Sequence, residues 1–160
     1  MVITSTATAG DVWRLLDRVV DPEIPVLTLA DLGVLRDVEI SEDGGVTVTI
    51  SPTYSGCPAL ETMRSDIRKV LKGKGFTEID IDTVHHPAWS TDMMSTEGLA
   101  KLEEFGIAPP GPTAMPEAPV LCPQCASAET RTVSRFGSTA CKALMVCSVC
   151  REPFDYFKAI

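Results

Sequence analysis

Two closely spaced pairs of cysteines constrain this chain more than any other feature. Cys122 and Cys125 form one C-x2-C pair, Cys147 and Cys150 form a second, and 21 residues separate the two pairs. Each pair lets two thiolates reach one ion from a tight turn, and two pairs complete a tetrahedral four-sulfur shell of the kind that structural zinc uses. We therefore predict that these four cysteines bind one metal ion.

The four sulfurs do not by themselves identify the ion, because rubredoxin-like iron or an iron–sulfur cluster uses the same donors. Closed four-thiolate sites are most often structural zinc, so zinc is the predicted metal. A module of about 40 residues buries too little apolar surface to fold alone, and a metal contributing on the order of 10 kcal/mol supplies the missing stability. Residues 130–135 and 154–157 have strand composition, which favours a zinc ribbon.

Composition and charge exclude several classes of function for the rest of the chain. Of its 160 residues, 44% are hydrophobic and 22% are charged, which is typical of a globular protein. The formal charge of -8 argues against a nucleic-acid binder, because affinity for phosphates comes mainly from clustered Lys and Arg. No stretch approaches the roughly 20 apolar residues of a membrane-spanning helix, and the first ten residues lack a signal peptide. We expect a cytoplasmic protein with no membrane partner.

A proline-rich segment divides the chain. Five of the 12 prolines fall within residues 108–119, and such a run cannot form helical or sheet hydrogen bonds. Residues 1–107 carry 9 basic and 18 acidic side chains, whereas residues 108–160 carry 5 and 4. We therefore predict a first domain over 1–107, a semi-rigid linker over 108–119 and the four-cysteine ribbon over 120–160.

The first domain is predicted to be a small α+β fold. Apolar residues recur at helical spacing in two segments, and β-branched residues gather in three others. The resulting order, α-β-β-α-β, buries one face of a small sheet under two helices. The expected elements are helices over 9–20 and 60–71, strands over 32–40, 46–50 and 76–84, and a further short helix over 96–105.

A lone cysteine in this domain is the second chemical candidate. Cys57 stands between Gly56 and Pro58, and its predicted place is the N-cap or first position of the second helix. Backbone N–H groups and the helix dipole there stabilise a thiolate, which would make Cys57 a nucleophile or a soft-metal ligand. An inert cysteine that fills the helix entry explains the position equally well, so both interpretations stay open.

Three further features are predicted to be structural. Cys141, the fifth thiol of the tail, is interpreted as a small hydrophobic residue of the ribbon core, with ligand exchange to a partner as the alternative. His85 and His86 are adjacent at a strand end and cannot easily face one ion, so a surface role is expected. Asp21 precedes Pro22 and is first of all a turn former.

Several short motifs together resemble a known family. Residues 21–25 (DPEIP), 31–34 (DLGV) and 87–94 (PAWSTDMM), with the Gly-Cys-Pro around Cys57, resemble the domain shared by SufT and the eukaryotic cytosolic iron–sulfur targeting factors. The tail resembles the PaaD family of the bacterial phenylacetate pathway. Its matching motifs are the two cysteine pairs, 106–110 (GIAPP), 136–144 (FGSTACKAL) and 152–154 (EPF).

The resemblance covers nearly the whole chain and implies an accessory protein of the phenylacetyl-CoA 1,2-epoxidase system that helps to mature its iron-containing parts. The implied partners are the reductase subunit, with its [2Fe–2S] cluster, and the di-iron oxygenase subunits. Cys57 matches the family's lone Gly-Cys-Pro thiol, and the four tail cysteines match its ribbon ligands. The resemblance also implies a further cysteine near the C-terminus, where this chain has Phe-Lys-Ala over 157–159.

These observations favour a maturation factor that is not an enzyme. On this hypothesis Cys57 transiently binds iron or an iron–sulfur cluster, and the zinc ribbon supplies a rigid docking surface. Two alternatives stay open: a structural adaptor that remains with the oxygenase complex, and a rubredoxin-like electron carrier that uses the ribbon site. An exposed sheet edge also leaves homodimerisation open.

Overall fold

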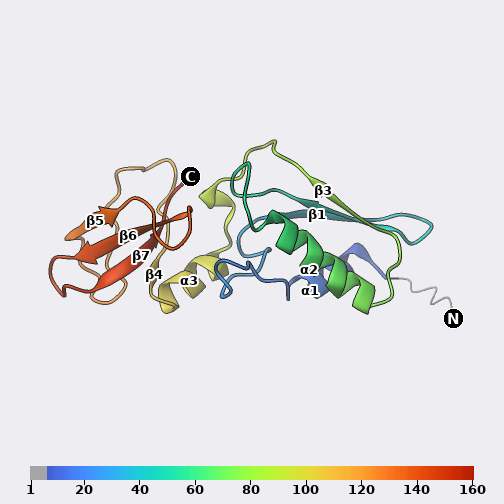
Figure 1. The fold of residues 1–160 in the computed structure, drawn as a ribbon, viewed down its shortest axis with the longest axis horizontal. Helices are drawn as coiled ribbons and strands as arrows, with labels where there is room; N and C mark the ends of the chain where they lie inside the picture. Colours follow the sequence, from blue (N-terminus) through green and yellow to red (C-terminus); the bar gives the residue numbers. More distant parts are fainter. Residues whose placement is uncertain (1–6) are drawn as a thin grey trace. The chain divides into compact units, whose positions relative to one another are not determined.

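Two helices cover one face of a three-stranded sheet in the first part of the chain (Figure 1). The computed structural model describes residues 7–160, and the chain divides into two units between Trp89 and Ser90. The second unit contains a short helix and a four-stranded sheet. The α+β class predicted from the sequence is confirmed. Within residues 7–160, no helix has both the length and the apolar content needed to cross a bilayer.

The sheet of the first unit has the order β1-β2-β3. Strands β1 (Leu35–Ile40) and β2 (Val46–Ile50) form the predicted antiparallel hairpin, and β3 (Ile79–Thr83) runs parallel to β2. Side chains alternate along the central strand: Val48 is fully buried, whereas its neighbour Thr49 is partly exposed. The apolar side chains of β2 therefore face the helices.

The helices bury their apolar faces against that sheet. Helix α2 (Leu60–Gly73) buries Met63, Ile67 and Leu71, which recur at helical spacing as predicted. Helix α1 (Ala9–Leu16) begins at a capping box with Thr8 as the N-cap residue. Both helices thus follow the periodicity of the sequence.

Helix α1 ends at Leu16, four residues earlier than predicted. The apolar stripe continues to Val20, but the backbone of residues 19–21 pairs with that of residues 27–29 in an irregular loop. The carbonyl of Val19 accepts from Leu29 N–H at 2.9 Å, and Val20 forms a bridge with Thr28. Asp21 is a turn former, as predicted: its Oδ1 accepts the N–H groups of residues 23 and 24, each at 2.7 Å.

The second unit is built around a sheet of order β4-β7-β6-β5. Its short helix α3 follows Ser95, whose side chain accepts from Gly98 N–H at 2.9 Å. Strands β4 and β6 were not predicted from the sequence, because a two-residue strand has no pattern and the apolar run of β6 does not alternate with polar residues. The elements are η1 (Thr91–Met93), α3 (Thr96–Glu104), β4 (Ile107–Ala108), β5 (Thr130–Ser134), β6 (Lys142–Cys147) and β7 (Pro153–Phe157).

The first half of the proline-rich segment is held within the second unit. Strand β4 pairs in parallel with β7, so residues 107 and 108 belong to the ribbon sheet. Thr113 donates its N–H to Asp92 at 3.1 Å and donates its hydroxyl to the same carboxylate. These two hydrogen bonds lower the pKa of Asp92. The boundaries of 1–107, 108–119 and 120–160 stay predictions.

Candidate metal centre

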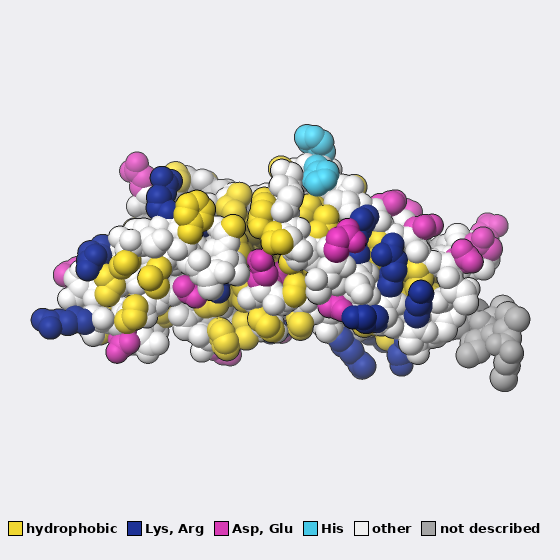
Figure 2. Space-filling model, viewed as in Figure 1, with side chains coloured by type: hydrophobic (Ala, Val, Ile, Leu, Met, Phe, Trp, Pro, Cys, Tyr) yellow, Lys and Arg dark blue, Asp and Glu magenta, His cyan; other side chains and the backbone are white. Residues whose placement is uncertain are grey.

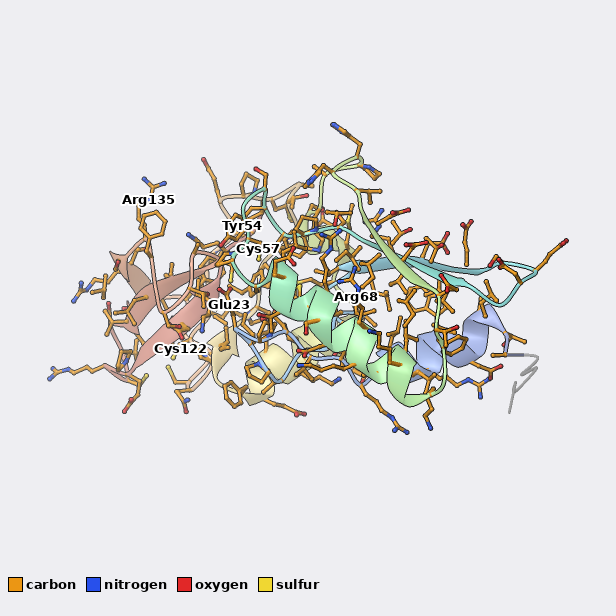
Figure 3. The ribbon with its side chains drawn as sticks, turned by 45° about the vertical axis from the view of Figure 1, so that its right-hand side comes forward. Glu23, Tyr54, Cys57, Arg68, Cys122 and Arg135 are labelled. Carbon is orange, nitrogen blue, oxygen red and sulfur yellow. The ribbon has the colours of Figure 1, made fainter. Side chains whose placement is uncertain are left out.

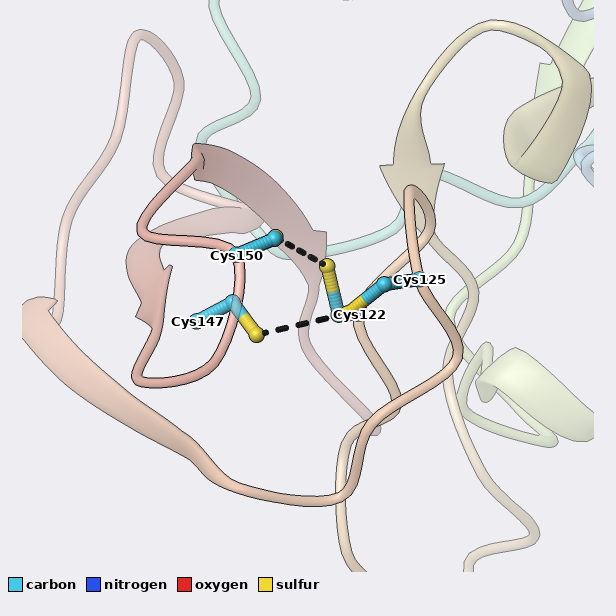
Figure 4. A group of neighbouring side chains, drawn as sticks. All are labelled: Cys122, Cys125, Cys147 and Cys150. Carbon is cyan, nitrogen blue, oxygen red and sulfur yellow. Dashed lines mark hydrogen bonds between the residues drawn. The ribbon is translucent and has the colours of Figure 1, made fainter.

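The four predicted metal ligands come together at one end of the ribbon sheet (Figure 4). All four Sγ atoms lie within 4.8 Å of one another. The Cys122 and Cys150 sulfurs are 3.6 Å apart, as are those of Cys125 and Cys147. A zinc tetrahedron with Zn–S bonds of about 2.3 Å requires sulfurs about 3.8 Å apart. The donor set and its spacing therefore fit a four-thiolate metal ion.

Two tight turns bring these sulfurs together. The first turn is closed by hydrogen bonds from Cys122 N–H to Ser127 O at 2.9 Å and from Ala126 N–H to Cys122 O at 2.8 Å. The second lies between β6 and β7, where Cys147 N–H donates to Glu152 O at 3.0 Å. A similar backbone turn thus presents each cysteine pair.

Both turns place a residue with a side chain in the left-handed region. Ala126 has a φ of 60° and Arg151 a φ of 64°, and each directly follows the second cysteine of its pair. This conformation costs an ordinary L-residue about 1–2 kcal/mol, which glycine avoids. The sequence carries no sign of it, because neither alanine nor arginine indicates a positive φ.

Replacing Ala126 by glycine is therefore expected to stabilise the ribbon. Relief of the left-handed strain outweighs the extra backbone entropy of glycine, which leaves a gain of about 0.5–1 kcal/mol in the free energy of unfolding. Thermal unfolding of Ala126→Gly checks this, with Ala128→Gly as the control outside the turn. A lower melting temperature for Ala126→Gly than for the parent would contradict the strain argument.

The environment of the sulfurs separates their acidities. The backbone N–H of Cys150, with that of Val149, lowers the pKa of the Cys147 thiol to about 6. For Cys150 the N–H of Glu152 acts in the same direction, but burial and the neighbouring thiols outweigh it and raise the pKa to about 12. Ionisation of the Cys147 thiol is therefore favoured, and ionisation of the Cys150 thiol beside it is disfavoured. Ionising all four requires a cation among them.

Cys57 lies in the first unit, in the loop between β2 and α2 (Figure 3). The N-cap of α2 is Ala59 and the helix begins at Leu60, so the prediction that Cys57 is the N-cap or first residue is wrong by two residues. The Cys57 N–H donates to Tyr54 O at 3.3 Å, and its carbonyl accepts from Leu60 N–H at 3.2 Å. Cys57 therefore lies in the turn before α2 and not in the first helical turn, where the stabilisation of a thiolate by the dipole was predicted.

The Cys57 side chain is 8% exposed, which places it at the edge of the core. A small exposed fraction suits a thiol that meets its target only when a partner docks, but it suits a packing cysteine equally. Its role stays a prediction.

The remaining sequence candidates take structural positions. Cys141 is buried, its Sγ lies 3.0 Å from Thr139 Oγ1, and it is outside the group of four sulfurs. Burial in the ribbon is what its interpretation as a small hydrophobic residue predicted. His85 and His86 are exposed in the loop after β3 and stand out on the surface (Figure 2). The expected surface role for the two histidines is confirmed.

Comparison with known families supports both halves of this description. Residues 10–81 match the family model "Iron-sulfur cluster assembly protein", and residues 108–158 match "PaaD zinc beta ribbon domain". A domain of unknown function, DUF59, from Bacillus anthracis superimposes on the chain with a TM-score of 0.56 and 30% identity. That match covers 59% of this chain and 90% of the solved one.

Two curated relatives extend the match. A protein of Escherichia coli (strain K12), provisionally named as a subunit of 1,2-phenylacetyl-CoA epoxidase, is 48% identical over 94% of this chain and 92% of its own length. An "Fe-S protein maturation auxiliary factor" of Porphyromonas gingivalis is 43% identical over 59% of this chain and 90% of its own. The chain therefore belongs to the PaaD family, with an iron–sulfur cluster assembly domain followed by a PaaD zinc β-ribbon.

Proposed function

We propose that this chain is an accessory maturation factor of the phenylacetyl-CoA 1,2-epoxidase system, which helps iron or an iron–sulfur cluster to reach a subunit of that system. The observation that carries the proposal is the union, in one chain, of an iron–sulfur assembly domain with a four-thiol ribbon. Three relatives that match the first domain are named maturation auxiliary factors, and a relative that matches nearly the whole chain is named as a subunit of the epoxidase.

Within this proposal the two kinds of thiol have different tasks. The four ribbon cysteines hold zinc permanently; a closed four-thiolate site leaves no coordination position for a substrate, so the ion supplies only a cross-link. Cys57 is the proposed transient ligand of the cargo, because it is the one thiol within residues 10–81, which match the iron–sulfur cluster assembly family, and it is not among the four grouped ribbon sulfurs. The proposed location is the cytoplasm, where thiols remain reduced and able to bind metal.

The proposed clients are the reductase subunit, with its [2Fe–2S] cluster, and the di-iron oxygenase. Delivering iron or a cluster to either client does not require this chain to break or form a bond in phenylacetyl-CoA, so no catalytic residues are assigned. A structural adaptor is the alternative, and it differs in one measurable respect: an adaptor stays bound to the mature epoxidase.

Production of the epoxidase subunits with and without this chain tests the proposal. We expect the reductase or oxygenase made without it to contain several-fold less iron, measured by elemental analysis and by visible absorption of the reductase cluster. Equal iron in both preparations of both proteins would contradict a maturation role. Stable co-elution with a mature epoxidase, together with equal iron content, would favour the adaptor.

A further inference from the structure

The two layers of the first unit differ in their balance of charge, because basic residues outnumber acidic ones by seven to four on or just after the helices. The four acidic residues there are Asp11, Asp17, Glu61 and Asp66. Four exposed carboxylates lie on the sheet face that the helices leave open, where Glu39 and Asp80 flank Thr47, and Asp37 and Asp82 flank Thr49. Eight of the chain's 14 basic residues lie in this unit, and seven of them are on or just after α1 and α2. The seven are Arg14, Arg18, Arg64, Arg68, Lys69, Lys72 and Lys74.

Helix α2 gathers the centre of this positive layer. Arg64, Arg68 and Lys72 recur every four residues and so form a row about 12 Å long on one side of the helix. The space-filling view shows Lys and Arg side chains gathered over this part of the molecule, and Arg68 stands at the middle of the helix (Figures 2 and 3).

Arg68 and Lys72, the second and third residues of the row, are not neutralised by acidic side chains of residues 7–160. Arg64 pairs with Glu61 at 3.4 Å. By contrast Arg68 and Lys72 are exposed, and across residues 7–160 neither forms an ion pair. Their charge therefore remains available to another molecule.

Helix stability does not account for the row. Like charges one turn apart destabilise a helix by about 0.2–0.5 kcal/mol for each pair. The helix dipole favours a cation at Lys72, in the last turn, but not at Arg68 in the middle of α2. In a chain with 22 acidic residues and 14 basic ones, an acidic partner for Arg68 at i−4 or i+4 would have been the stabilising choice.

We propose that the exposed face of α2, centred on Arg68 and Lys72, docks a carboxylate-rich surface of a partner protein. A nucleic acid fits less well, because its continuous row of phosphates would also meet the field of the acidic sheet layer and of a chain with net charge -8. A protein partner can instead confine its carboxylates to the surface that contacts α2, away from the acidic face of the sheet. The inference goes beyond the proposed function and does not depend on what Cys57 binds.

Binding of a fluorescein-labelled, 16-residue Glu-rich peptide to the full-length protein at low salt tests the proposal. We expect Arg68→Glu/Lys72→Glu to weaken binding by about tenfold or more, since two contacts turn from attractive to repulsive. The matched control is Arg131→Glu/Arg135→Glu, which makes the same change in net charge at exposed positions on and beside β5. We expect this control to bind within about twofold of the parent.

Three results would overturn the proposal: no binding of the peptide by the parent, equal weakening in both variants, or tighter binding of a 16-nucleotide single-stranded DNA than of the peptide. Amide chemical-shift changes on adding the peptide should concentrate in residues 60–74, and changes confined to other segments would also overturn it. Arg68→Gln/Lys72→Gln, which only neutralises the row, provides the same comparison if the charge reversal lowers the melting temperature.

Discussion

Removing the metal from the four-cysteine site is expected to unfold the ribbon while the first unit stays folded. The small core of the ribbon contains two of the ligands themselves, because Cys122 and Cys147 are buried beside Met145 and Phe154. Without the ion these thiols no longer cross-link the two turns, and a contribution on the order of 10 kcal/mol is lost. That exceeds what such a core provides.

Amide spectra before and after chelation provide the measurement. Signals from β5, β6 and β7 should collapse towards random-coil positions, while those from β1, β2 and β3 should remain dispersed. Cys147→Ser should give the same spectrum and reduce the metal content from about one ion per chain to nearly none. Cys141→Ser is the control, since Cys141 lies outside the group of four sulfurs.

Two observations would contradict this account of the metal site. One is a ribbon that stays folded after complete chelation. The other is iron, instead of zinc, found by elemental analysis of protein prepared without oxygen; it would favour the rubredoxin-like carrier and remove the zinc assignment.

Replacing Cys57 by serine is expected to abolish client maturation without unfolding the protein. A hydroxyl is a poor ligand for iron or a cluster compared with a thiolate, so the iron content of the client should fall on the order of tenfold or more. The fold should survive, because the side chain is 8% exposed at the edge of the core and differs from serine by one atom. A stability change of about 1 kcal/mol is expected.

The measurement is client iron content after co-production with each variant, with the melting temperature and ribbon metal of each variant recorded alongside. Cys57→Ala should fail as Cys57→Ser does, since both remove the thiol. Cys141→Ser is the matched control and should support maturation. Full client activity with Cys57→Ser would end the idea of a relay through this thiol and leave Cys57 as a packing residue.

The sequence predicted the metal site closely because spacing along the chain carries most of its geometry. A C-x2-C pair can close only a tight turn, so the convergence of Cys122, Cys125, Cys147 and Cys150 required little knowledge of the rest of the fold. The same holds for the hairpin of β1 and β2 and for the buried face of α2, whose signals are periods of two and of about four residues.

Features that depend on hydrogen bonds between distant segments of the chain were not predicted from the sequence. Helix α1 stops at Leu16 because residues 19–21 pair with 27–29, and the apolar stripe that continues to Val20 carries no sign of this. Strand β4 exists only because β7 lies beside it. Cys57 precedes its helix by more than expected, since the chain makes an additional turn before Leu60. In each case hydrogen bonds formed outside the regular element outweigh local propensity.

The four-thiol centre, the α+β class and the family could be predicted from the amino-acid sequence alone, because each rests on residue types at short, fixed spacings. The gathering of Asp37, Glu39, Asp80 and Asp82 on one open face of the sheet, by contrast, depends on the tertiary structure. That acidic face arises when strands distant in sequence pair in register, which aligns Asp37, Thr49 and Asp82 across three strands. No local pattern encodes that alignment.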